Sequence, residues 1–157
     1  MSMANKRKQI PTTKKTNGRG KQIVEPHLYN SDSKKVAWCF DMVDKNGAFR
    51  FAPERPDFDC KKVIEKLLSF SSMTWADLKR STHDQGKSKH HFLSLDALSH
   101  EAMERIKALN LGEEDQDRIF SLALENKLRL IGVRENEKFH VIWYDPKHEF
   151  CPSHQRN

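Results

Sequence analysis

The side chains best suited to chemistry lie in the C-terminal third of the chain. Arg129 can hold a phosphate through two parallel hydrogen bonds. Tyr144 can stack on a base or move a proton, and His148, which titrates near neutral pH, can act as a general acid or base. Metal-independent cleavage of a phosphodiester needs such a set, because it uses a cation for the developing charge and two proton carriers within hydrogen-bond reach.

Two neighbouring histidines, His90 and His91, add candidate proton carriers. His90 is the last residue of a polar stretch, residues 81–90, and His91 follows it. The composition of this stretch predicts a surface loop. Because successive residues of a strand point to opposite faces, we expect only one of the two histidines to enter a given site.

A zinc-like spacing occurs near the C-terminus, at His148, Cys151 and His154. Tetrahedral zinc needs four ligands, or three and a water, and Cys39 and Cys60 stand alone and form no second half of such a motif. The sequence also lacks a P-loop, a dinucleotide-type glycine fingerprint and a serine elbow. We therefore expect neither a metal nor a cofactor.

Three strand-like runs must position these candidate residues. They cover 118–124, 128–134 and 139–144, and polar spacers of hairpin length separate them, which predicts an antiparallel meander. If Arg134 faces Phe139 and Leu124 faces Leu128, strand alternation sorts every side chain onto one of two faces, and Arg129 lies opposite Tyr144.

The two predicted faces of this meander differ in composition. One is apolar, and we expect it to lie under the helices: Phe120, Leu122, Leu124, Leu128, Leu130, Phe139, Val141 and Trp143. The other is half polar, and we expect it to carry the site: Ile119, Ser121, Ala123, Arg129, Ile131, Val133, His140, Ile142 and Tyr144.

Short strands and helices precede the meander. Hydrophobic runs beside turn signals predict strands at 36–40, 48–51 and 91–95. Apolar residues at helical spacing, and a capping box at Thr74–Asp77, predict helices at 57–70, 74–80 and 99–110. The sequence thus predicts an α+β fold, an antiparallel sheet that ends in a three-stranded C-terminal meander with helices packed on one face.

The positive charge of the chain is concentrated at its N-terminus. Residues 1–35 hold nine basic and two acidic side chains, a net charge of +7, whereas the rest holds 19 basic and 20 acidic residues, a net charge of −1. With almost no apolar content, residues 1–35 are expected to form a disordered arm before a single domain at 36–152 and a frayed terminus at 153–157. Seven cations of this arm are candidates for contacts with nucleic-acid phosphates: Lys6, Arg7, Lys8, Lys14, Lys15, Arg19 and Lys21.

Several classes of protein are disfavoured by composition. No apolar run approaches the roughly 20 residues of a membrane span, and the first thirty residues lack the apolar core of a signal peptide. Three cysteines without a C-x-x-C motif make a disulfide framework improbable. We expect a cytoplasmic protein that does not associate with membranes.

The order of elements, with an arginine in the middle strand of the closing meander, resembles the RelE-type mRNA interferases of bacterial toxin–antitoxin pairs. The resemblance covers mainly 99–148, and the segment 36–95 has no counterpart in those compact toxins. It implies that Arg129 stabilises phosphate charge, that Tyr144 or His148 transfers protons, and that the partners are RNA, the ribosome and an antitoxin protein.

A second set of motifs resembles an uncharacterised family of small bacterial and phage proteins through most of 36–152. It comprises Trp38-Cys39-Phe40, Ser72-Met73-Thr74-Trp75, the His90-His91 strand, Arg129-Leu130-Ile131-Gly132 and Trp143-Tyr144-Asp145-Pro146-Lys147-His148. This resemblance implies a bacterial or mobile-element origin and no particular activity.

The first hypothesis is therefore an RNA-directed, metal-independent endoribonuclease of the toxin type. Its catalytic candidates are Arg129, Tyr144, His148, and His91 or His90. Two alternatives remain open: an accessory protein that binds nucleic acid without cleaving it, and a protein-interaction module, which the nearly neutral domain favours.

Overall fold

The computed structural model describes residues 31–81, 86 and 88–153. Its elements, with η for a 3-10 helix, follow in chain order: η1 (Ser31–Ser33), β1 (Ala37–Cys39), α1 (Cys60–Ser71), α2 (Trp75–Arg80), β2 (His91–Phe92), η2 (Leu95–Ala97), α3 (His100–Ala108), α4 (Glu113–Gln116), β3 (Ile119–Glu125), β4 (Leu128–Glu135) and β5 (Lys138–Asp145). Within these residues, no helix has the length and apolar character needed to cross a membrane.

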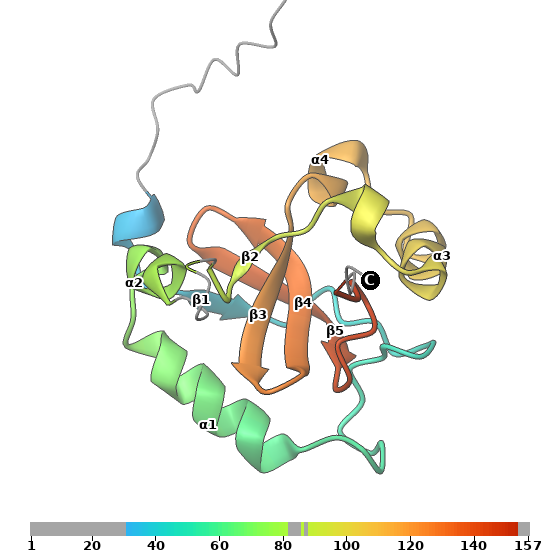
Figure 1. The fold of residues 1–157 in the computed structure, drawn as a ribbon, viewed down its shortest axis with the longest axis horizontal. Coiled ribbons are helices and arrows are strands. Elements are labelled where there is room, and N and C mark those ends of the chain that lie inside the picture. Colours follow the sequence, from blue (N-terminus) through green and yellow to red (C-terminus); the bar gives the residue numbers. More distant parts are fainter. Residues whose placement is uncertain (1–30, 82–85, 87, 154–157) are drawn as a thin grey trace, which may run out of the picture.

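The strands form one five-stranded sheet in the order β1-β5-β4-β3-β2 (Figure 1). The predicted α+β class and the C-terminal meander of β3, β4 and β5 are confirmed. The sheet is mixed rather than wholly antiparallel, because β1 lies parallel to β5. The strand expected at 48–51 is reduced to an isolated bridge between Arg50 and Trp143.

Local sequence signals account for most of the turns and helix ends. Asn126 and Asn136 close the two hairpins of the meander with φ angles of 49° and 55°, a conformation that asparagine tolerates better than most residues. Thr74 and Asp77 form the predicted capping box at the start of α2. Gly112 occupies the N-cap position of α4.

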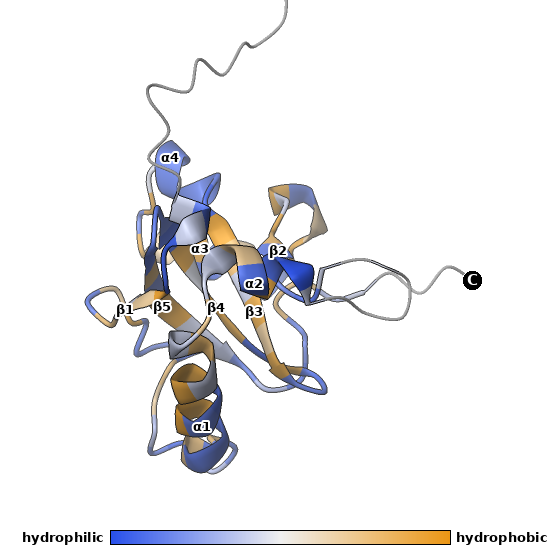
Figure 2. Ribbon diagram, turned by 90° about the vertical axis from the view of Figure 1, so that its left-hand side faces the viewer, coloured by the Kyte–Doolittle hydropathy of each residue, from blue (hydrophilic) through white to orange (hydrophobic). Residues whose placement is uncertain are grey.

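Helices cover both faces of the sheet, whereas we expected them on one (Figure 1). On the α1 face, Val63 and Leu67 of α1 and Trp75 of α2 pack against the sheet. On the α3 face, Ala102 and Ile106 of α3 do the same. Figure 2 shows hydrophobic residues along the strands and on α1, and a hydrophilic α4. The predicted half-polar face is therefore buried and is not a solvent-facing surface.

The predicted register is correct through most of the meander and wrong at its end. Arg134 pairs with Phe139 and Ala123 with Arg129, as expected, but a register shift after Ala123 pairs Leu128 with Glu125 and not with Leu124. A bulge in β5 then shifts the pairing by one residue, so Arg129 lies opposite Asp145 and not opposite Tyr144. Beyond the bulge the faces exchange: Trp143 packs on the α3 face and Tyr144 packs on the α1 face.

Two features accompany this bulge. The backbone comes close at Gly132, where an added Cβ would lie 1.9 Å from the carbonyl oxygen of His140, so only glycine fits. On the other side of β5, the Ile142 carbonyl accepts from Asp44 N–H (2.9 Å), and Tyr144 N–H donates to the Phe49 carbonyl (2.8 Å). The segment 44–50 therefore pairs with the irregular part of β5.

The start of the described chain is fixed to the domain by charge. Arg134, which is buried, donates to Asp32 of η1 (2.6 Å) and stacks over the Trp75 ring at 4.0 Å. Lys79 donates to the same carboxylate (2.7 Å). Residues 31–35, expected to belong to the arm, therefore belong to the packed domain.

Candidate functional site

Tyr144, predicted to face substrate, is enclosed beneath the loop that leads into α1. Its side chain is 1% exposed, and its ring lies 4.3 Å from that of Phe58 between centroids. The hydroxyl donates to the Asp57 carbonyl (2.9 Å) and accepts from Asp59 N–H (3.1 Å). Desolvation raises the pKa of Tyr144 above its ordinary value. The phenol thus fixes the backbone of residues 57–59, which lead into α1.

Arg129, predicted to bind phosphate, donates hydrogen bonds within the β3–β4 hairpin. Its Nη1 donates to the carbonyls of Asn126 (2.6 Å) and Leu128 (3.1 Å), and the residue is 7% exposed. Desolvation lowers the pKa of the guanidinium, while the nearby charge of Asp145 acts in the opposite direction. Arg129 therefore lies within the α3 face, beside a carboxylate.

The two histidines point to different sides of the sheet edge, as their adjacency predicted. His90 is buried against Phe70 of α1, with ring centroids 5.3 Å apart, and its Nδ1 accepts from Ala123 N–H (3.1 Å). His91 is exposed on β2, opposite Ser121, and its Nδ1 lies 3.0 Å from the Phe92 carbonyl. His90 is a packing residue, and His91 lies on the outermost strand.

Asp145 organises the turn that follows β5. Its carboxylate accepts from the backbone N–H groups of Glu149 (3.0 Å) and Phe150 (2.9 Å). His148 adopts a φ of 58° in this turn, and its charge acts on Asp145. Burial raises the pKa of Asp145, although these hydrogen bonds lower it in part. His148 and Arg129 therefore both interact electrostatically with Asp145, a carboxylate that sequence reasoning did not nominate.

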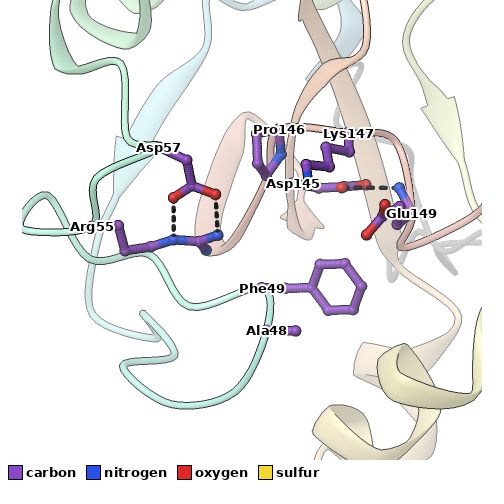
Figure 3. Close-up of a pocket in the computed structure, with 8 residues that line it drawn as sticks. All are labelled: Ala48, Phe49, Arg55, Asp57, Asp145, Pro146, Lys147 and Glu149. Carbon is purple, nitrogen blue, oxygen red and sulfur yellow. Dashed lines mark hydrogen bonds and ion pairs between the residues drawn. The ribbon is translucent and has the colours of Figure 1, made fainter.

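A pocket of about 200 Å³ opens beside this turn, between the segment 48–57 and the end of β5 (Figure 3). Arg55 forms a forked pair with Asp57 there, with both nitrogen–oxygen distances 2.8 Å. The guanidinium of Arg55 also donates to the Arg50 carbonyl (2.9 Å). The remaining lining residues are Ala48, Phe49, Asp145, Pro146, Lys147 and Glu149.

The size and charge of this pocket limit its chemistry. Sites for drug-sized ligands occupy roughly 300–1,000 Å³, so the pocket is too small to enclose a nucleotide. Its lining holds three carboxylates against two cations, and the hydrogen bond from Arg55 lowers the pKa of Asp57 and keeps that carboxylate charged. The pocket suits water or a small cation better than a phosphate.

The five predicted catalytic residues do not converge. Arg129 and His148 lie near Asp145, whereas Tyr144 and His90 belong to the α1 face and His91 lies at the sheet edge. Lys6, Arg7, Lys8, Lys14, Lys15, Arg19 and Lys21 lie outside the described residues, as do His154 and half of the predicted loop 81–90.

Sequence reasoning also missed residues that the fold brings together. Asp145 precedes a proline, a pattern typical of turn initiation, which could have indicated its structural role. Within the described part of the chain, ligand atoms of Cys39, Asp41 and His140 lie within 4.8 Å of one another near the start of β5. The spacing of Cys39 and Asp41 was visible in the sequence, but their distance from His140 depends on the β1–β5 pairing.

Comparison with protein-family models, with curated proteins and with solved structures found no match for this chain. The resemblances noted from the sequence therefore stay predictions.

Proposed function

We propose that this protein binds RNA through the basic segment 1–35, and that the α+β domain presents this segment without cleaving the RNA. The separation of charge along the chain carries the proposal: residues 1–35 have a net charge of +7, and the remaining residues have a net charge of −1. Lysine and arginine side chains that neutralise phosphates release bound counterions, which favours binding to any nucleic-acid backbone. The basic segment supplies this chemistry, whereas the domain as a whole does not.

The way in which the segment joins the domain supports the proposal. Asp32, held by Arg134 and Lys79, fixes the described chain at a point C-terminal to the seven N-terminal cations. Lys138 is exposed and pairs with Ala37, and Lys35 is exposed two residues earlier in the chain. These two lysines extend the basic segment onto the β1 edge of the sheet.

The surroundings of the predicted catalytic residues favour binding over cleavage. The Tyr144 hydroxyl, a nitrogen of Arg129 and a nitrogen of His90 are all bonded to the backbone of the domain. An endoribonuclease of the toxin type remains the second candidate, because Arg129 and His148 both lie close enough to Asp145 to affect it electrostatically.

The binding proposal is tested by the salt dependence of the affinity for a single-stranded RNA. We expect the affinity to fall steeply with salt for the full chain, and we expect a variant with all seven N-terminal cations replaced by glutamine to flatten the slope by up to about 5. Fluorescence anisotropy over a salt series measures this slope. An unchanged slope in the seven-residue variant would remove the proposal, and equal affinity for duplex DNA would widen it to nucleic acid in general.

A matched pair of lysines tests the role of the domain edge. Lys138 and Lys127 are both exposed and lie at the hairpins at opposite ends of the β4 strand. Lys138→Gln is expected to reduce the salt slope by up to about 0.7, while Lys127→Gln leaves it unchanged. Equal effects of the two substitutions would argue against an RNA path along the β1 edge.

Cleavage is tested separately, by incubating the full chain with labelled RNA and separating the products by electrophoresis. We expect intact RNA and no arrest of bacterial growth when the chain is expressed. Cleavage that Arg129→Ala and His148→Ala both abolish, in folded variants, would establish the ribonuclease instead.

A further inference from the structure

A group of side chains with metal-ligand atoms lies at the β1 edge of the sheet. The parallel register places Cys39 of β1 beside His140 of β5, and Asp41 follows Cys39 by two residues. Nδ1 of His140 lies 2.8 Å from Oδ1 of Asp41, and a thiol, a carboxylate oxygen and an imidazole nitrogen lie within 4.8 Å of one another. The strand pairing thus assembles three kinds of ligand from distant parts of the sequence.

The other nitrogen of His140 is the unusual feature of this group. Nε2 is buried and makes no hydrogen bond, and the whole imidazole is 13% exposed. A carboxylate oxygen of Glu135 lies 3.5 Å from this nitrogen, close enough for a modest rotation to form a hydrogen bond. Since a buried polar atom without a partner is costly, a rotation that lets Nε2–H donate a hydrogen bond to the Glu135 carboxylate would stabilise the imidazole.

We propose that Cys39, Asp41 and His140 bind a zinc ion through Sγ, a carboxylate oxygen and Nδ1, with a water molecule as the fourth ligand. Glu135 then accepts a hydrogen bond from Nε2–H, as carboxylates commonly do behind a metal-bound histidine. This proposal departs from the expectation, drawn from the sequence, that the protein binds no metal. None of the three ligands belongs to the zinc-like spacing of His148, Cys151 and His154.

The donor set selects the metal. Thiolate and imidazole suit zinc, whereas calcium and magnesium prefer six or more oxygen ligands. Zinc–ligand distances of roughly 2.0–2.3 Å require neighbouring ligand atoms to lie about 3.3 Å apart, so the contact between Asp41 and His140 must open by about 0.5 Å. Asp41 can make this movement, because its side chain is 64% exposed and follows the end of β1.

Zinc binding changes the protonation of two ligands. The Cys39 thiol loses its proton to solvent, and Nδ1 must be unprotonated, so the single proton of the neutral imidazole resides on Nε2. Affinity therefore falls as pH falls. The bound ion would join β1, a three-residue edge strand, to β5, and it would stabilise the edge where the chain enters the sheet.

The experiment uses the full chain, freed of metal with a chelator, and titrates it with zinc and with cobalt. We expect one zinc per chain by calorimetry, a raised thermal midpoint in zinc, and a sulfur-to-cobalt charge-transfer band in the near-ultraviolet spectrum. Cys39→Ser should abolish the band and weaken zinc binding at least about tenfold. The matched control is Cys60→Ser, because Cys60 is an exposed cysteine on α1, and this variant should keep both the band and the affinity.

Two further variants protect the test against a misfolded Cys39→Ser protein. Asp41→Asn changes an exposed side chain and should weaken zinc binding without unfolding the domain. Glu135→Gln should keep the charge-transfer band and weaken zinc binding by about 10–100-fold. A band that survives Cys39→Ser, or zinc affinity unchanged in both Asp41→Asn and Glu135→Gln, would overturn the proposal. None of these outcomes depends on whether the chain binds RNA.

Discussion

The two faces of the sheet are buried by different means. On the α1 face the side chains between sheet and helices are mainly apolar, with buried His90 and Arg134 as polar exceptions. Three aromatic rings, Trp75, Phe120 and Phe139, meet there. On the α3 face the apolar residues share the interior with buried polar and charged side chains: Asp44, Ser121, Arg129 and Asp145.

Asp44 shows how the α3 face accommodates charge. Its carboxylate accepts from Nε1 of Trp143 (3.0 Å) and from Nε (2.8 Å) and Nη2 (2.9 Å) of Arg105 on α3. A buried charge is tolerated only when it is paired and hydrogen-bonded, so each polar group on this face depends on its partners. Stability should therefore depend on contact area on the α1 face and on complete hydrogen-bond networks on the α3 face.

Among the substitutions that compare the two faces, we expect the largest loss of stability at Asp44. Asp44→Ala leaves the Trp143 N–H and the Arg105 guanidinium without their acceptor, and we expect a loss of about 3–5 kcal/mol in the free energy of unfolding. Urea denaturation measures the loss. Glu104→Ala, an exposed acidic position on the same helix as Arg105, is the control and should change stability by less than about 0.5 kcal/mol. Similar values for both would mean that the network contributes little.

Two leucine-to-alanine substitutions test the packing of the α1 face by urea denaturation. Leu130 has no exposed surface, and Leu130→Ala should cost about 2–5 kcal/mol through lost burial and the cavity that remains. Leu68 on α1 is 67% exposed, so the identical substitution there should cost less than about 0.5 kcal/mol. A small loss at Leu130 would indicate that this face is loosely packed.

Much of the fold could be predicted because its signals are local. The meander follows from three alternating runs with short polar spacers, and Asn126 and Asn136 supply the turn conformations. The parallel pairing of β1 with β5 could not be predicted, because it joins residues about one hundred positions apart that carry no shared local pattern. The covering of the second face was missed because polar residues in its strands indicated exposure, whereas they are satisfied internally.

The site was predicted less well for one specific reason. Strand alternation assigns Trp143 and Tyr144 to the correct faces of the sheet only when β5 is regular. The bulge in β5 reverses the face of every residue beyond it, so both assignments were wrong. Gly132 was the signal, since a glycine inside a strand often marks a bulge or a close backbone approach. The sequence could identify Arg129 and His148 as polar residues near the end of the meander, but not that both interact electrostatically with the buried carboxylate of Asp145.

Tyr144 distinguishes a packing role from the catalytic role predicted at first. Tyr144→Phe removes the acceptor of Asp59 N–H and the donor to the Asp57 carbonyl, so we expect a loss of about 1–3 kcal/mol in unfolding free energy. RNA affinity measured by anisotropy should not change. A variant of normal stability that loses an RNA-directed activity would restore the catalytic assignment.

The smallest change at neutral pH is expected at Asp145. Asp145→Asn removes a buried charge, which favours the folded state, but an amide has one acceptor oxygen for the two N–H groups of Glu149 and Phe150. Because these effects oppose each other, we expect a net change within about 1 kcal/mol.

The pH dependence of the same variant is more informative than its stability at one pH. Burial raises the pKa of Asp145 in the folded state, so the folded protein holds this proton more tightly than the unfolded chain does. Asp145 therefore adds stability as pH falls through its raised folded pKa, and the gain is complete below the ordinary aspartate pKa of about 4. The parent should gain stability relative to Asp145→Asn over this range in urea titrations. Asp57 gives the opposite control: Arg55 lowers its pKa, so the parent should lose stability relative to Asp57→Asn as pH falls.

Parallel curves of unfolding free energy against pH for the parent and Asp145→Asn would contradict the prediction. They would show that Arg129 fully compensates the buried charge of Asp145, and that the polar α3 face is as insensitive to pH as the mainly apolar α1 face.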